Sequence, residues 1–295
     1  MEVVINVLGI LRDSLHYYRE VRLIIDTHIH IPNEWIKSSV HPREVAERLI
    51  EFMYESGIDV AVILPIAPYI PNDYVYKVVS YEPKRLVGFA SVVPNPADVA
   101  ISELRRAIKD LGLKGLKLHP GIQGFCIRHP HVVKVLKEAG ELGIPVVIHA
   151  MKGDLSTLYF KSTKEHTLPT PDRIEDYDLL PALAPETTII YAHMGGLFGF
   201  REFMCLAAGH PNIYLDTSYS LVTIVEEIGA DRLSTYIKHL GADKFVFGSD
   251  HIIGLTPKWL SAKRQIDIIK TLPGLSDEEK ELILSGNAKK LMKIK

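Results

Sequence analysis

The sequence predicts an α/β fold, a (β/α)8 barrel, on three observations. Eight short apolar runs recur along the chain, and most are continuous, as expected for parallel strands covered on both faces. Segments with helical periodicity separate these runs. The connections that follow the runs are long and rich in proline and glycine, whereas those that precede them are short. An open doubly wound sheet is the alternative.

The predicted strands share a bias toward β-branched residues and a length of six to eight residues. In a barrel, the loops after the strands carry the active site, so the residues that end each run are candidates for chemistry. The eight strands are LIIDTHIH (23–30), VAVILP (60–65), LVGFASV (86–92), LKGLKLH (113–119), PVVIHA (145–150), TTIIYAHM (187–194), IYLDTS (213–218) and FVFGSD (245–250).

Predicted helices separate the strands. The first, 42–57, begins with proline and ends on glycine, the usual asymmetry of helix ends. The segments 1–20 and 276–295 lie outside the eight units and are expected to be additional N- and C-terminal helices on a single domain, 1–295. The longest connection, 151–173, is long enough to form a lid. Further helices are predicted at 97–112, 130–143, 174–184, 201–209, 222–240 and 258–271.

The composition indicates a cytoplasmic protein without a polyanionic partner. Lys and Arg number 34 against 36 Asp and Glu, so no basic surplus favours nucleic acid. The N-terminus lacks a basic region typical of a signal peptide, and no apolar run reaches the length of about 18 residues that a membrane span needs. Cys126 and Cys205 form no CxxC pair, which is typical of a reduced protein.

Two histidines end the first predicted strand at a spacing of i, i+2. Residues at this spacing share one face of a strand, so His28 and His30 point the same way. If that face is the barrel interior, burying two imidazoles without partners costs about 1–3 kcal/mol each. A metal ion satisfies both rings, whereas two ordinary core or surface histidines are the alternative for an isolated HxH motif.

Metal-binding residue types also end three other predicted strands. His149 ends the fifth, His193 ends the sixth, and Asp250 ends the eighth. Since the first and last strands of a barrel are neighbours, Asp250 is expected beside the HxH motif. Gly195 and Gly196 follow His193 and would let backbone come close to whatever lies there. Together these positions predict a metal site at the C-terminal end of the barrel.

A set of short motifs covers nearly the whole chain and carries a family resemblance. As a set, they resemble the amidohydrolase superfamily, specifically its second large family of TIM-barrel metal-dependent hydrolases, which also contains the aminocarboxymuconate semialdehyde decarboxylase-like enzymes. The motifs are DTHIH (26–30), GLKLHP (115–120) with GIQGF (121–125), VVIHA (146–150), YAHMGG (191–196), LDTS (215–218), FGSD (247–250) and GNAKKLM (286–292).

The resemblance implies a role for each strand-end residue. His28, His30, His149 and Asp250 would hold one divalent metal, most simply Zn²⁺, with a coordination position left open. His193 would lie beside the metal-activated water and orient or activate it, and Asp250 would double as the proton shuttle. General chemistry agrees, because bound zinc lowers the pKa of water to about 7 and a nearby carboxylate can take its proton.

Lys117 and His119 on the fourth strand leave the number of metal ions open. Some members of the superfamily carboxylate a strand-four lysine to bridge two metals, in which case His149 and His193 would bind the second ion. The favoured alternative is an uncarboxylated Lys117 that binds a substrate anion or an adjacent acid. His119 precedes a proline and is expected to shape the loop.

Several other residues are candidates for supporting roles. Asp26 is expected to share the face of His28 and to orient a ligand histidine, or else to be structural. Asp216 either faces the pocket or is an ordinary polar strand end, and Asn287 is expected to cap or anchor the last helix. Candidates for binding a substrate carboxylate are Arg128, Lys152 and Arg201, and candidates for lining an apolar pocket are Trp35, Phe160 and Tyr219.

Two reactions fit this predicted site. The first is hydrolysis, in which metal-activated water attacks the carbonyl carbon of an amide, lactone or related ester. The alternative is non-oxidative decarboxylation of a small hydroxyaryl or unsaturated carboxylic acid. An aldolase that uses Lys117 as a Schiff base would leave the metal-binding residues unexplained, and related DNases usually carry a glutamate on strand four. We expect a small-molecule substrate, no nucleic-acid or membrane partner and, by analogy with relatives, a homodimer.

Overall fold

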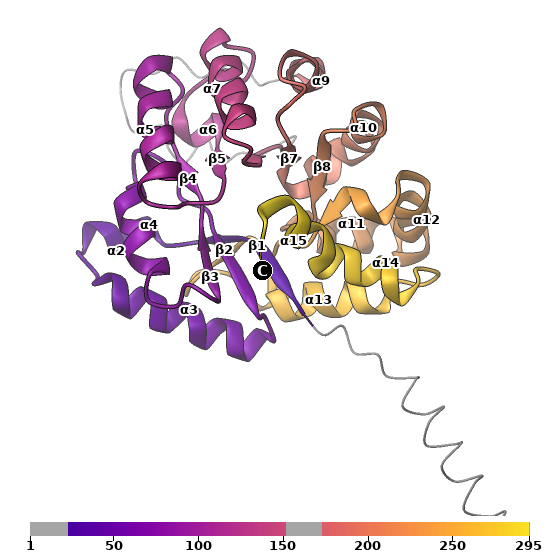
Figure 1. The fold of residues 1–295 in the computed structure, drawn as a ribbon. Coiled ribbons are helices and arrows are strands. Elements are labelled where there is room, and N and C mark those ends of the chain that lie inside the picture. Colours follow the sequence, from indigo (N-terminus) through magenta and orange to yellow (C-terminus); the bar gives the residue numbers. More distant parts are fainter. Residues whose placement is uncertain (1–22, 152–172, 295) are drawn as a thin grey trace, which may run out of the picture.

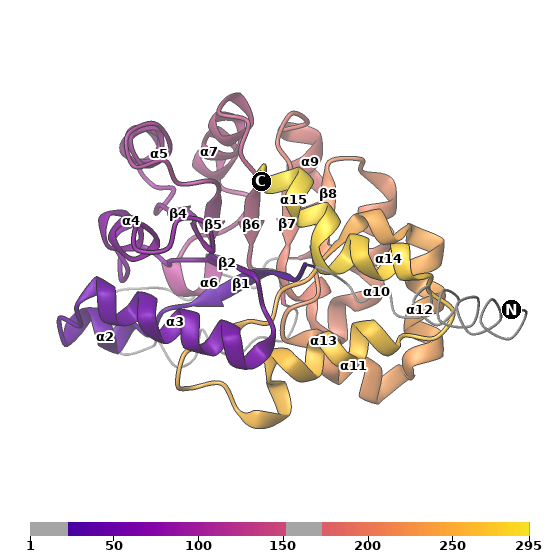
Figure 2. The ribbon, with the colours of Figure 1, turned by 60° about the horizontal axis from the view of Figure 1, so that its bottom comes forward.

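The structure, a computed structural model, describes residues 23–151 and 173–294. All of its paired strands are parallel and follow the predicted order, which confirms the (β/α)8 barrel. Figures 1 and 2 show the helices on the outside of the strands. The strands are β1 (Ile25–His30), β2 (Val60–Ile63), β3 (Leu86–Gly88), β4 (Ala90–Ser91), β5 (Leu116–Leu118), β6 (Val146–Ile148), β7 (Ile189–Tyr191), β8 (Ile213–Asp216), β9 (Phe245–Val246) and β10 (His251–Ile252).

Two interruptions divide the ring into sheets ordered β10-β1-β2-β3 and β4-β5-β6-β7-β8-β9. The first lies inside the predicted strand 86–92, where the backbone N–H of Phe89 donates to Ile63 of β2 and that of Ala90 donates to Gly115, the residue before β5. The second lies between β9 and β10. Here the N–H of Thr27 donates to the carbonyl of Phe247 at 2.9 Å, and Ile29 pairs with His251, so the last strand lies beside the first.

The helices predicted between the strands are all present, but one of them is divided in two, and the helices 33–37, 72–79 and 120–123 were not predicted. The predicted helix 222–240 is two helices that meet at Gly229, whose φ of 83° breaks the first helix. The helix after β2, 72–79, was not predicted, because its run of valine and tyrosine lacks strong helix formers. The helices are α2 (Asn33–Lys37), α3 (Pro42–Ser56), α4 (Asn72–Val79), α5 (Ala97–Lys109), α6 (Pro120–Gln123), α7 (Pro130–Glu141), α9 (Ile174–Leu183), α10 (Gly196–Gly209), α11 (Ser220–Ile228), α12 (Ala230–Leu240), α13 (Ala262–Thr271), α14 (Asp277–Glu281) and α15 (Asn287–Met292).

The predicted C-terminal helical segment anchors the last strand. The side-chain amide of Asn287 donates to the carbonyls of Ala242 and Phe245 at 2.8 and 2.7 Å, as its predicted anchoring role requires. The predicted N-terminal helix, 1–20, lies outside the described residues, as does the predicted lid apart from its two end residues. In the described part of the chain, no helix has both the length and the apolar character to cross a bilayer.

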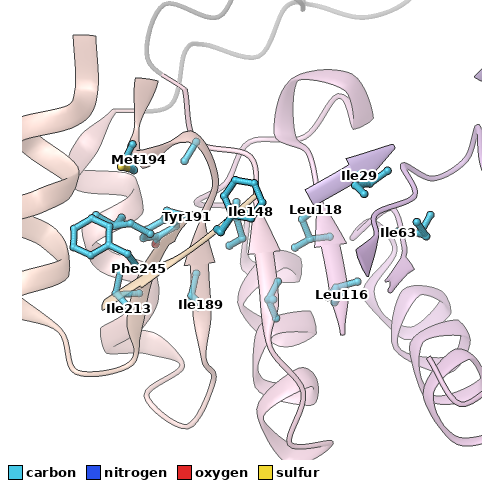
Figure 3. Close-up of a cluster of buried hydrophobic side chains, with 14 of the residues drawn as sticks. Ile29, Ile63, Leu116, Leu118, Ile148, Ile189, Tyr191, Met194, Ile213 and Phe245 are labelled. Atoms are coloured by element: carbon cyan, nitrogen blue, oxygen red, sulfur yellow. The ribbon is translucent and has the colours of Figure 1, made fainter. Parts of the chain in front are cut away.

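Two apolar cores lie on opposite faces of the strands. The larger one packs the strands against the helices, and Figure 3 shows part of it on neighbouring strands, including Leu118, Ile148 and Tyr191. The smaller one contains residues that alternate with these, such as Val147 and Ile190, together with Met292 of α15. The strand face that carries Val147 continues two residues later to His149. The same strands therefore supply apolar packing within the barrel and polar groups at its C-terminal end.

Asp26 fastens the first strand to the last. Its Oδ1 accepts the backbone N–H of Ser249 at 2.9 Å and that of His28 at 3.1 Å. The pairing register of β1 against β2 shifts between Asp26 and Ile29, so the regular alternation that placed Asp26 beside the His28 ring is broken. The predicted contact with that ring is therefore replaced by hydrogen bonds to backbone, and Asp26 has the structural role.

We expect Asp26→Ala to lower the free energy of unfolding by about 2–5 kcal/mol, because two buried backbone N–H groups lose their acceptor. Asp26→Asn keeps an oxygen at the same place and should lose much less. Urea denaturation of the two variants beside the wild type measures the difference. Equal stability of Asp26→Ala and wild type would show that Asp26 does not hold the first and last strands together.

Candidate metal centre

The hydrogen bonds of His28 and His30 fix which ring nitrogen carries the proton. His28 donates from Nδ1 to Oδ2 of Asp216 at 2.6 Å, and His30 donates from Nδ1 to the carbonyl of Leu64 at 2.7 Å. A neutral imidazole has one N–H, so each Nε2 is left with a lone pair. These two Nε2 atoms lie 3.1 Å apart. Two facing lone pairs repel one another unless a cation lies between them.

Asp250 brings a carboxylate to the same point. Its Oδ1 lies 3.5 Å from Nε2 of His28 and 3.4 Å from Nε2 of His30. Ligands about 2.0–2.1 Å from a tetrahedral zinc ion are about 3.3–3.5 Å from one another. The two separations from Asp250 match one face of such a site, and the 3.1 Å between the two Nε2 atoms is slightly shorter. The chemistry of the three donor atoms fits a divalent metal.

The backbone around Asp250 is shaped for this approach. Asp250 has a left-handed φ of 58°, uncommon for a residue with a side chain and typical of functional sites. A Cβ on Gly248 would lie 2.7 Å from Cβ of His28, so only glycine lets the segment between β9 and β10 come so close to β1. Burial raises the pKa of Asp250, but its contacts with His30, His193 and His28 outweigh this and hold the pKa well below its usual value.

Asp216 faces the site, but it orients His28 and is unsuited to bind the metal. Oδ1 accepts the backbone N–H groups of His193 and Ser218 at 3.1 and 2.8 Å and also the Ser218 hydroxyl, while Oδ2 accepts from His28. Donor atoms of His28, His193 and Asp216 do lie close enough for an ion. However, Asp216 is already surrounded by hydrogen-bond donors, so we assign it the positioning role common behind metal-binding histidines.

His193 and His149 form a second pair. Nδ1 of His193 donates to Ser218, with the carbonyl 3.2 Å and the hydroxyl oxygen 2.9 Å away, which leaves a lone pair on Nε2. That Nε2 lies 3.0 Å from Nδ1 of His149. Burial lowers the pKa of His193 to about 4, so the ring is neutral at pH 7. His193 itself has a left-handed φ of 62°.

The structure thus brings three of the four predicted ligands together and places the fourth beside His193. Among the described residues, His28, His30 and Asp250 form one cluster of converging donor atoms. His149 does not belong to this cluster. The close approach predicted at Gly195 is made by Phe203 of α10, because a Cβ on Gly195 would lie 2.2 Å from the Phe203 ring. That glycine therefore serves packing between the His193 loop and α10.

Lys117 is fully buried beside the cluster. Its Nζ lies 3.2 Å from Nε2 of His28. Burial lowers the pKa of Lys117 to about 8, although the charges of Asp216 and Asp250 oppose this. A partly neutral amine near the donor atoms is compatible with a carboxylated Lys117 that bridges two metals and also with an uncarboxylated lysine. Lys117 is not among the residues that line the adjacent cavity, and its role stays a prediction.

A cavity of about 420 Å³ opens beside these residues. Tyr219 lines it, as predicted, whereas Trp35, Arg128 and Arg201 do not. Arg128 instead faces Asp176 at 3.8 Å, and Trp35 lies beneath the guanidinium of Arg48. Lys152 and Phe160 lie outside the described residues. The polar part of the wall comprises His30, Asn33, Glu34, His119, His149, His193 and Asp250, and the rest is mainly apolar.

Two important residues were not predicted from the sequence. Ser218 holds Asp216 and both neighbouring imidazoles in place, although only its position after a strand-end aspartate could have indicated this. Gln123 accepts the backbone N–H of His119 at 2.7 Å and donates to the carbonyls of Ala67 and Val92 at 3.2 and 3.0 Å. It thereby joins three loops at the mouth of the barrel.

The family model described as amidohydrolase matches residues 25–294. The chain belongs to the amidohydrolase family. That range holds every residue of the site described above, and it confirms the family indicated by the sequence motifs. Members of this family are enzymes, and the related proteins described next include decarboxylases and a hydratase.

Three related proteins illustrate the range of the family. The 2-amino-3-carboxymuconate-6-semialdehyde decarboxylase of Dictyostelium discoideum is 26% identical over 259 residues, covering 76% of this chain. This chain spans 66% of that protein's length. The 4-oxalomesaconate hydratase of Rhodopseudomonas palustris has a TM-score of 0.66 at 21% identity, over 92% of this chain and 96% of that one. A dihydroxybenzoic acid decarboxylase of Polaromonas, with bound manganese and 2-nitroresorcinol, has a TM-score of 0.63 at 18% identity, over 92% and 97%.

We expect Asp216→Asn to weaken metal binding about 10- to 100-fold, because it removes the negative acceptor that holds the proton on Nδ1 of His28. Competition with a chromophoric chelator measures the affinity for zinc. The matched control is Asp178→Asn, since Asp178 also accepts from a histidine, His210, but at the surface. Equal affinities for the two variants would contradict the role assigned to Asp216.

Proposed function

We propose that the chain is a metal-dependent hydrolase that uses activated water on an amide, lactone or related carbonyl substrate. The observation that carries this proposal is the pair of Nε2 lone pairs of His28 and His30, which face each other beside the carboxylate of Asp250. We propose that these three residues and His149 hold one divalent metal, most simply Zn²⁺. Related proteins support metal dependence, since the Polaromonas decarboxylase contains manganese.

A metal held at this site would polarise a substrate oxygen and lower the pKa of water. The chain's own residues would then manage the protons. His193 is neutral, and its Nε2 accepts from Nδ1 of His149 at 3.0 Å. This lone pair would be free to accept a proton from water at the cavity wall once His149 turns to the metal. Asp250 also lines the cavity, and its ionised carboxylate can carry a proton to the leaving group. Ser218 and Asp216 keep His193 in the orientation that this role needs.

Decarboxylation is the second candidate, and the name of the Dictyostelium relative favours it. The same residues would then bind the substrate's carboxylate or an adjacent oxygen, and a protonated group would deliver a proton to carbon as carbon dioxide leaves. The cavity volume suits a small molecule in either case. From the balanced charge and the family resemblance, we further propose a cytoplasmic homodimer without nucleic-acid or membrane partners.

Assays of the zinc-loaded protein against lactones, amides and hydroxybenzoate-like acids separate the two reactions. We expect hydrolysis of a lactone or amide without release of carbon dioxide. Carbon dioxide release from an aromatic or unsaturated acid, without hydrolysis of any carbonyl substrate, would replace the first reaction by the second.

His193→Asn should lower kcat by about 100-fold or more while metal content stays unchanged, because Nε2 would be lost as a proton acceptor but the metal cluster would remain. Elemental analysis of the same preparation supplies the metal content. Loss of metal together with activity would instead make His193 a ligand and favour two ions bridged by a carboxylated Lys117.

A further inference from the structure

Three histidines of this chain precede a proline and cap a helix in the same way. His41, His119 and His129 each accept on Nδ1 a hydrogen bond of 3.2 Å from a backbone N–H two or three residues later. They stand at the start of α3, α6 and α7. An imidazole that accepts on Nδ1 carries its proton on Nε2. Each of the three rings therefore presents an N–H donor on its far side.

His119 differs from the other two in its surroundings. His41 and His129 are exposed, so water can accept from their Nε2–H groups. His119 is 5% exposed and lines the cavity, and its ring stacks on His149 with the centroids 3.8 Å apart and the planes 11° apart. In the described part of the chain, nothing accepts a hydrogen bond from its Nε2–H. A mostly buried donor of this kind is unfavourable unless something in the cavity accepts from it.

The capping role does not account for this placement. The two exposed caps show that a histidine before a proline needs only its Nδ1 to begin a helix. His119 is in addition fixed through its backbone, because its N–H donates to Gln123, which also holds the loops after β2 and β4. The ring is thus held by the backbone of α6 and by His149, and the backbone of the same residue is held by Gln123. Such preorganisation is typical of groups that meet a ligand.

The neighbours of His119 define what it can bind. It stacks on His149, whose Nδ1 lies 3.0 Å from His193, so its donor is one ring away from the proposed catalytic base. Among the described residues of the cavity wall there is no lysine or arginine. A substrate oxygen that reaches this side of the cavity therefore meets neutral donors.

We infer that His119 is a substrate-binding residue whose Nε2–H donates a hydrogen bond to a carboxylate or carbonyl oxygen of the molecule bound in the cavity. This inference rests on the proposed function, because it takes the cavity beside the metal cluster as the substrate site. It adds a specificity-determining contact that the metal cluster and His193 do not provide.

Benzoate binding to the zinc-loaded protein tests the inference without turnover. His119→Asn keeps an acceptor near the position of Nδ1 but has no group at Nε2, whereas glutamine can place an N–H near Nε2. We expect His119→Asn to weaken benzoate binding about three- to tenfold, the effect of one hydrogen bond, and His119→Gln to stay within about twofold of wild type. His129→Asn is the matched control for replacing a capping histidine by asparagine and should bind as wild type does.

Two results of the binding experiment would overturn the assignment. One is equal benzoate affinity of His119→Asn and wild type with unchanged thermal stability, and the other is a loss of affinity that His119→Gln does not restore. Long-range ¹H–¹⁵N spectra of histidine-labelled protein give an independent readout. The His119 ring should show a proton on Nε2 that moves downfield on addition of benzoate, and a proton on Nδ1 would also overturn the assignment.

The proposed function can fail separately from this inference. If no carbonyl substrate or acid turns over, but benzoate binding still depends on His119 as expected, the reaction is wrong and the binding contact stands. If turnover and metal binding are as proposed, but benzoate binds equally to all variants, the His119 assignment alone is wrong.

Discussion

The hydrogen bond from Nδ1 of His28 to Asp216 is the interaction on which the rest of the metal centre depends. It holds the proton on the nitrogen remote from the cavity, so the lone pair of Nε2 faces the other donors. Asp216 can accept this bond on Oδ2 because its Oδ1 is fixed by three donors. They are the backbone N–H of His193 and the backbone N–H and hydroxyl of Ser218. Ser218 also accepts from Nδ1 of His193. Asp216 and Ser218, at the end of one strand, therefore decide that His28 and His193 both present Nε2 to the site.

The barrel makes this arrangement possible at the cost of strained backbone. Asp250 and His193 both adopt left-handed φ values, at about 1–3 kcal/mol each, and the packing of two apolar cores around the strands holds them there. Gly248 lets the last strand approach His28. Asp26 then fastens that strand to β1 through the residue before Asp250, so closure of the barrel and placement of a metal-binding carboxylate are coupled.

The fold and the positions of the strand-end residues could be predicted from sequence because parallel strands impose a simple pattern. An apolar run followed by a polar end residue was sufficient for His28, His149 and Asp250. The contacts between side chains were harder to predict. The register of β1 against β2 shifts between Asp26 and Ile29, and no periodicity indicates such a shift. Asp26 accepts from the backbone N–H groups of His28 and Ser249. The Ser218 and Gln123 contacts join segments remote in sequence, so only the folded chain shows them.

The most direct test of this account is a crystal structure of the zinc-loaded protein with anomalous data collected at the zinc edge. We expect one strong peak about 2.0–2.2 Å from Nε2 of His28, Nε2 of His30 and a carboxylate oxygen of Asp250, with Nδ1 of His28 still donating to Asp216. A peak bound through Nδ1 of His28 and Asp216, or none beside the Nε2 atoms, would contradict it.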